Sequence, residues 1–161
     1  MSLVRFRAHA IAAPKIVMLF ADAASQRTWR EWCLQHGFDI THKFTGRRIS
    51  PTEFDFHTTL LASKNAITLP ATSHAIRPLT LLPCGFEVLG EKTPTAVFPA
   101  VPDLTAKRDH LISTYGIEPT FPTFRPHVSL SYNWDGKPLL NVLPLPPPMT
   151  FDRWVVKPFE D

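Results

Sequence analysis

Cysteine and glycine are scarce in this sequence, with two cysteines and six glycines among 161 residues. Cys33 and Cys84 lie in no paired motif and beside no histidine at metal-ligand spacing. We therefore expect free thiols in a reducing cytoplasm, while a single disulfide between them stays open on sequence grounds. The glycines form no glycine-rich phosphate loop, which argues against the nucleotide-binding classes that depend on one.

Long apolar runs and a strong charge imbalance are also absent. No stretch approaches the roughly 20 apolar residues needed to cross a membrane. The N-terminus superficially resembles a signal peptide, but Pro14 and Lys15 interrupt its apolar part, so we expect neither a leader nor a membrane partner. The net charge of +3 is scattered along the chain, which argues against duplex nucleic acid but suits a phosphate-bearing ligand.

The apolar content is sufficient for a hydrophobic core. At 44% hydrophobic and 19% charged, the sequence predicts one globular domain over residues 1–161. Residues 1–14 are expected to form a loose arm or an edge strand. Period-two and continuous apolar runs predict strands at 15–21, 55–62, 127–133 and 150–159, with two or three more between 75 and 102.

Two segments have the pattern of amphipathic helices. In the first, "DAASQRTWREWCLQHG", Asp22 or Ser25 can cap the start, Gly37 ends it, and Trp29 and Trp32 fall on the buried side. The second, "PDLTAKRDHLISTYG", is opened by a proline and closed by a glycine. Each helix follows a strand and precedes a strand with a histidine. The sequence therefore predicts an α+β fold of duplicated strand–helix–strand units with mostly antiparallel sheets.

The two histidine-bearing strands carry the candidate chemistry. In "DFHTTLLAS" and "RPHVSLSYN" a hydroxyl residue follows the histidine at the second position, as His57 with Thr59 and His127 with Ser129. Strand side chains alternate between faces, so each pair shares a polar face opposite an apolar one. Facing histidines supply an acid and a base near neutral pH, and the hydroxyls can donate to phosphoryl oxygens. This set suits cleavage of a phosphodiester without a metal or other cofactor.

A metal site is the alternative at the first strand. Glu53, Asp55 and His57 fall at period two, which could place three ligands on one face. No second acidic cluster accompanies His127, so no metal is expected. The other histidines have no hydroxyl at the second following position and are expected at the surface or half-buried: His9, His36, His42, His74 and His110.

The paired elements His57-Thr58-Thr59-Leu60 and His127-Val128-Ser129-Leu130 resemble the signature of the 2H phosphoesterase superfamily. That resemblance implies a bilobal α+β fold with two pseudo-symmetric lobes flanking a central cleft. The lobes would span approximately 15–65 and 95–135, with 75–92 and 150–158 completing the sheets. Ser129 stands where threonine is commoner in the superfamily, and it keeps the hydroxyl.

Within the superfamily the chain looks most like the phage anti-CBASS cyclic-oligonucleotide phosphodiesterases. The similarity lies in "RPHVSLSYN", "LTLLPCGFEVLGE" and "LLNVLPLPPPMTFDRWVVKPFED", and it runs over roughly residues 15–160. It implies hydrolysis of cyclic di- or trinucleotides such as cyclic GMP–AMP, which would silence host antiphage signalling in the cytoplasm of an infected bacterium. The resemblance implies no obligate protein partner.

Nucleobases need aromatic stacking surfaces, and phosphates need cations. The residues that we expect to bind substrate are Phe20, Trp134, Trp154 and Lys157, with Phe121, Phe124, Arg47 and Arg48 as further candidates. Three rival functions stay open: opening of 2′,3′-cyclic phosphates at RNA ends, sequestration of a nucleotide without cleavage, and a structural protein with a vestigial fold that binds no nucleotide.

Overall fold

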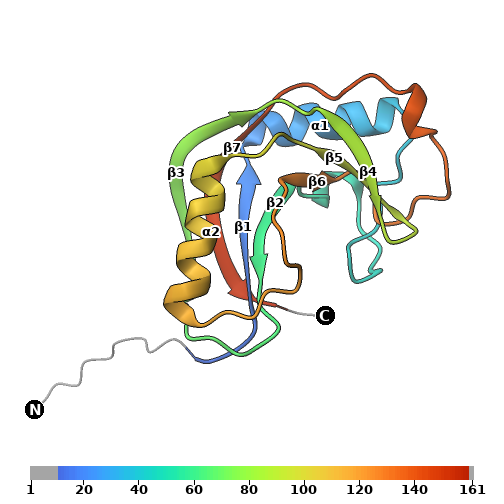
Figure 1. The fold of residues 1–161 in the computed structure, drawn as a ribbon. Helices are drawn as coiled ribbons and strands as arrows, with labels where there is room; N and C mark the ends of the chain where they lie inside the picture. The colour runs from blue at the N-terminus through green and yellow to red at the C-terminus, as the bar shows by residue number, and fades with distance from the viewer. Residues whose placement is uncertain (1–10, 160–161) are drawn as a thin grey trace, which may run out of the picture.

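The computed structural model describes residues 11–159, so most of the expected N-terminal arm, together with His9, lies outside the described residues. These described residues form an α+β fold with two antiparallel sheets and two α-helices (Figure 1). The elements are β1 (Lys15–Ala21), α1 (Ala23–Gln35), β2 (His57–Ala62), β3 (Thr72–Leu81), β4 (Gly85–Leu89), β5 (Thr93–Val97), α2 (Pro102–Tyr115), β6 (His127–Ser129) and β7 (Met149–Pro158), with short 3-10 turns at Pro51–Glu53 and Leu140–Val142. Within residues 11–159 no helix is long and apolar enough to span a membrane.

Both helices begin and end at the residues that the sequence predicts. The Asp22 carboxylate caps α1 by accepting a hydrogen bond from the Ser25 backbone N–H at 2.7 Å. Helix α2 starts at Pro102 and ends at Gly116, whose φ of 62° is the left-handed conformation that glycine adopts at low cost. Trp29 is fully buried, as expected for the inner face of α1.

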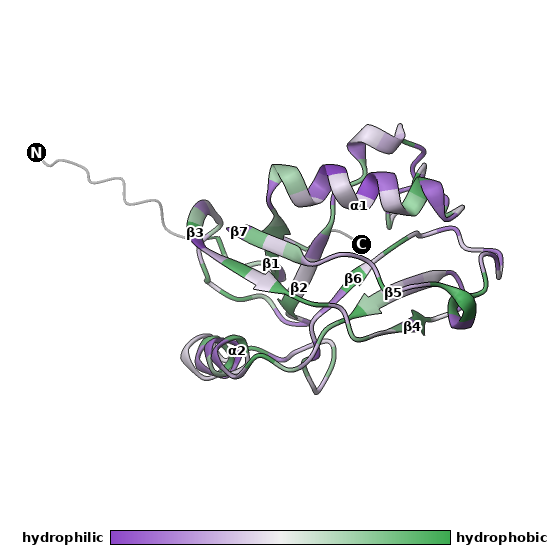
Figure 2. Cartoon of the chain, turned by 90° about the horizontal axis from the view of Figure 1, so that it is seen from above, coloured by the Kyte–Doolittle hydropathy of each residue, from purple (hydrophilic) through white to green (hydrophobic). Residues whose placement is uncertain are grey.

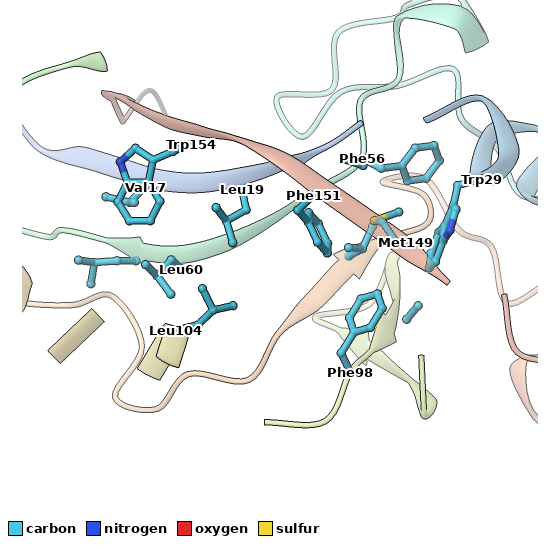
Figure 3. Packing of buried hydrophobic residues seen from close by; sticks show 14 of the residues in the cluster. Val17, Leu19, Trp29, Phe56, Leu60, Phe98, Leu104, Met149, Phe151 and Trp154 are labelled. Atoms are coloured by element: carbon cyan, nitrogen blue, oxygen red, sulfur yellow. The ribbon is translucent and has the colours of Figure 1, made fainter. Parts of the chain in front are cut away.

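The larger sheet has the strand order β2-β1-β7-β3. One of its faces is apolar and carries Val17, Leu19, Leu60 and Phe151, all at most 1% exposed. Figure 3 shows these side chains meeting Leu104 of α2, Trp29 of α1 and Phe98 in one continuous layer. The opposite face of β1 and β2 is not part of this layer, and it carries the histidine motif of the first unit.

The smaller sheet has the order β4-β5-β6 and meets the larger sheet at its β6 edge. The His127 backbone N–H donates a hydrogen bond of 3.3 Å to the buried Thr58 hydroxyl, so the edge strands β2 and β6 lie side by side. Figure 2 shows α1 and α2 on opposite sides of the strands. In both units the histidine strand pairs antiparallel with the strand that precedes its helix.

Strand β6 is shorter than the sequence predicts, because it ends at Ser129 and not near residue 133. Ser131 turns inward, and its hydroxyl donates to the Asp39 carbonyl at 2.6 Å while accepting from the Asn133 N–H at 3.1 Å. These local bonds replace the ladder that a longer strand would need. Strict alternation along 127–133 predicts Ser131 on the polar face of His127 and Ser129, and this prediction is wrong.

The cysteines are both free, as expected. Cys33 lies on the buried side of α1, and burial raises the pKa of its thiol far above the ordinary value. Cys84 is exposed at the start of β4. A thiol held in its neutral form is a poor nucleophile, so Cys33 serves packing.

Candidate active site

Side chains on the polar face of β1 and β2 line a cavity of about 1070 Å³. The antiparallel register places Phe20 opposite His57 and Met18 opposite Thr59. Residues paired across strands point to the same face, so these four side chains form one wall of the cavity. A cavity of this size exceeds that of most small-molecule pockets and can hold a ligand as large as a dinucleotide.

Strand β6 supplies a second wall. His127 pairs with Val97 and Ser129 pairs with Thr95, while Val128 between them is fully buried. Both His127 and Ser129 line the same cavity as His57 and Thr59. The structure thus brings together all four residues that the sequence proposes as catalytic.

The two histidines also influence each other electrostatically. The hydrogen bond from the His127 N–H to Thr58 Oγ1 ties the backbone of one motif to the centre of the other. The Lys157 ammonium and, after it, a positive charge on His127 both act to lower the pKa of His57. The histidines are therefore neighbours across the cavity and not residues of two separate sites.

His57 is half-buried and held in its neutral form. Its ring stacks on Phe20 with centroids 5.3 Å apart and an angle of 20° between the planes. Burial is the main cause that lowers the pKa of His57 to about 4, and the Asp55 backbone opposes this shift only in part. Nδ1 is buried and has no hydrogen-bond partner among residues 11–159, so we assign proton exchange with a ligand to Nε2. A neutral imidazole at physiological pH can accept a proton.

His127 is oriented by a backbone contact. Its Nδ1 lies 2.9 Å from the Arg125 carbonyl oxygen, and a carbonyl can only accept, so Nδ1 carries a proton. Nε2 is then the nitrogen that exchanges a proton with a ligand. In both motifs the backbone group that interacts with the histidine ring belongs to the residue two positions earlier, Arg125 for His127 and Asp55 for His57.

The burial of His57 predicts a pH-dependent stability. Its pKa is near 6.5 when unfolded and about 4 when folded, so the unfolded chain binds more protons between these values. The free energy of unfolding should therefore fall by roughly 2–3 kcal/mol through His57 as the pH drops from about 6.5 to about 4. Urea denaturation across this range, comparing wild type with His57→Gln, measures the difference. Because His110 is exposed, His110→Gln should keep the wild-type pH dependence, and a His57→Gln curve parallel to wild type would contradict the assignment.

Tyr132 lies at the cavity wall next to Ser129 and was not proposed as a site residue from the sequence. Burial raises the pKa of its phenol, and a hydrogen bond with the Ser129 side chain acts in the opposite direction. The tyrosine thus keeps a neutral O–H beside the Ser129 hydroxyl. Together with Thr59 they give this part of the cavity three hydroxyl groups that can donate to a ligand's oxygen atoms.

Three lysines from distant parts of the chain line the cavity: Lys43, Lys92 and Lys157. The sequence singled out only Lys157, because Lys43 and Lys92 stand in loops without a periodic pattern. Three carboxylates line it as well, Glu53, Asp55 and Glu91, and Asp55 is paired with Arg30 at 3.6 Å. The lysine ammonium groups are the candidates for contact with an anionic ligand such as a phosphate.

The expected aromatic surfaces are only partly at the cavity. Phe20 lines it, although its ring is stacked on His57, and Phe121 lines it as well. Trp154 does not, because it lies on the apolar face of β7 under the Lys107 ammonium, whereas Lys157, three residues later, is on the cavity face. Trp134 is also placed elsewhere, with its indole N–H donating to the Pro138 carbonyl at 3.1 Å. Trp134 and Trp154 are therefore not at the cavity wall, where the sequence predicted them.

The further candidates Arg47, Arg48 and Phe124 lie away from the cavity, whereas the acidic residues Glu53 and Asp55 line it without forming a metal site. Glu53 belongs to a 3-10 turn and accepts a hydrogen bond from the Ser50 N–H at 3.1 Å, so it does not continue the strand of His57. Within residues 11–159 no three His, Cys, Asp or Glu side chains gather closely enough to hold a metal ion.

No protein-family model matches the sequence, and a comparison with curated proteins finds no similar chain.

Proposed function

We propose that this protein is a metal-independent phosphodiesterase of the 2H type that hydrolyses the 3′–5′ bonds of cyclic oligonucleotides. The observation that carries the proposal is the meeting of His57, Thr59, His127 and Ser129 around one cavity. They come from the adjacent edge strands of two sheets, and each histidine lies opposite the end of the strand before its helix. This equivalence of register supports a bilobal fold with pseudo-symmetric lobes.

The histidines are assigned different roles. His57 is neutral at physiological pH, so its Nε2 takes the proton from the attacking hydroxyl. This hydroxyl is water, which hydrolyses the ester directly, or the ribose 2′-OH, which leaves a 2′,3′-cyclic phosphate that water opens in a second step. As the new P–O bond forms, the bond from phosphorus to the 5′-oxygen breaks. His127 donates the proton from its Nε2 to that leaving oxygen. Each histidine thus transfers one proton, and the pair ends in the reverse protonation state.

The hydroxyl groups and lysines act on the phosphoryl group. Thr59 and Ser129 donate hydrogen bonds to its non-bridging oxygens, whose charge grows in the transition state. Lys157 lines the same cavity as His57, so its ammonium is available to a phosphate bound beside the histidines. These contacts provide charge stabilisation at the site of the chemistry.

Two arguments favour a cyclic oligonucleotide as substrate. The cavity of about 1070 Å³ is larger than a single phosphate ester requires and is lined by aromatic side chains and by three lysines. The sequence resemblance to the phage anti-CBASS enzymes supports the same class. The biological consequence would be removal of the signal in the cytoplasm of the infected host, so that antiphage effectors stay silent.

A substrate panel in EDTA tests this function. Cyclic dinucleotides, cyclic trinucleotides and an RNA with a 2′,3′-cyclic phosphate end are incubated separately with the protein, and products are separated by chromatography. We expect linear products from at least one cyclic oligonucleotide and a much slower reaction with the RNA end.

Each other outcome contradicts the proposal in a distinct way. Preferred opening of the RNA end would identify an RNA-processing 2H enzyme. Recovery of intact cyclic nucleotide from a heat-denatured complex, without products, would identify a sequestering protein. Loss of activity in EDTA that Mg²⁺ or Zn²⁺ restores would contradict the metal-independent mechanism.

A further inference from the structure

Phe44 is an exposed aromatic residue at the cavity wall. It is 68% exposed and lines the same cavity as the histidine motifs. Single exposed apolar side chains are ordinary, and Leu82, at 65% exposed, is one that lies outside the cavity. Phe44 differs from Leu82 because it combines exposure with a flat aromatic ring and a position at the candidate site.

A short hairpin holds Phe44 in place. His42 and Arg48 form an isolated antiparallel bridge, and the Lys43 N–H donates to the Arg47 carbonyl at 2.9 Å. Gly46 closes the tip with a φ of 87°, which a residue with a Cβ rarely adopts. Buried Ile49 anchors the base of the hairpin in the core. The Phe44 ring therefore belongs to a hydrogen-bonded hairpin and not to an irregular loop.

The ring lies one aromatic side chain away from the hydroxyl groups. Tyr132 contacts Ser129 on one side and meets Phe44 on the other, with ring centroids 6.0 Å apart and an angle of 77° between the planes. Such a T-shaped contact occupies at most one face of the Phe44 ring, so the other face stays available. Lys43, the preceding residue, also lines the cavity.

We propose that Phe44 is a specificity-determining residue, the surface on which a nucleobase of the substrate stacks while its phosphate lies at the histidines. This inference rests on the proposed function. In a nucleotide the ribose lies between the base and the phosphate. In the cavity Tyr132 lies between Phe44 and Ser129, so a base on Phe44 would be separated from a phosphate at Ser129 in a similar way. Stacking tolerates any base, so Phe44 would select for a nucleotide over a small phosphodiester without fixing which nucleotide binds.

Replacing Phe44 by alanine tests the inference. Stacking on an aromatic ring is worth about 5- to 150-fold in affinity, so Phe44→Ala should raise KM for a cyclic dinucleotide by about tenfold or more with kcat changed less than about threefold. Phe44→Trp keeps a stacking face and should stay close to wild type. Leu82→Ala, a truncation of equal exposure outside the cavity, should change neither constant.

Binding to an inactive variant provides a readout independent of turnover. Calorimetry with the same cyclic dinucleotide and the His127→Ala protein should show about a tenfold weaker Kd when Phe44→Ala is added. An unchanged KM and Kd for Phe44→Ala would overturn the inference while leaving the proposed function in place. Failure of wild type to bind or cleave any cyclic oligonucleotide would overturn the proposed function itself.

Discussion

Replacing either His57 or His127 by alanine is expected to lower kcat about a hundredfold or more. In the proposed mechanism each variant removes one proton-transfer group, and general acid or base catalysis contributes roughly 10²–10⁴. Because that mechanism has the two histidines act on one phosphodiester, the double variant should be little slower than the slower single variant. Turnover of a cyclic dinucleotide at saturating concentration measures both effects.

Two controls separate chemistry from folding in this experiment. His110→Ala changes an exposed histidine of α2 outside the cavity and should keep wild-type activity. Thermal denaturation of each variant checks the fold, which matters most for His57 because its ring stacks on Phe20. Near-wild-type turnover by a folded His57→Ala or His127→Ala protein would refute the catalytic assignment.

Thr59→Val should lower kcat by about a hundredfold with a smaller change in KM. The substitution removes one hydroxyl donor to the transition state, and loss of a single donor of this kind costs roughly 10²–10³ in kcat. Valine keeps the branched shape and fits a β-strand, so the strand pairing of Thr59 with Met18 should persist. Steady-state kinetics on the cyclic dinucleotide give the two constants separately.

Three further variants keep the hydroxyl at position 59, remove the equivalent hydroxyl at position 129, or remove a hydroxyl outside the cavity. Thr59→Ser keeps the donor and should recover most of the activity, and Ser129→Ala should resemble Thr59→Val. Thr80→Val removes an exposed hydroxyl of β3 that bonds only to Thr150 at 2.7 Å and should be neutral. Equal kcat for Thr59→Ser and Thr59→Val would show that the hydroxyl has no part in the reaction.

The helices could be predicted closely because their boundaries depend on neighbouring residues. A carboxylate at Asp22 caps the first turn of α1, and a glycine at position 116 takes up a left-handed backbone after α2. Strand ends were less predictable. Strand β6 stops at Ser129 because Ser131 bonds to Asp39, a residue more than ninety positions earlier in the chain.

Strand alternation separates two of the residues that were expected to bind substrate. Trp154 and Lys157 are three positions apart on one strand, so alternation alone requires them to face opposite sides of the sheet. Period two would have separated them, and the structure places only Lys157 at the cavity. Lys43, Phe44 and Lys92 had no such signal, because they stand in turns whose position depends on distant partners.

The sequence by itself determined the two helices, the alternation of polar and apolar faces on the histidine strands, and the identity of the two histidine–hydroxyl pairs. These follow from contacts within a few residues and from the period of a strand. Only the tertiary structure decided that β2 and β6 meet edge to edge, that His57 is desolvated and neutral, and which aromatic and cationic side chains share its cavity. These features depend on packing between segments that are far apart in the chain, and local sequence patterns do not predict such packing.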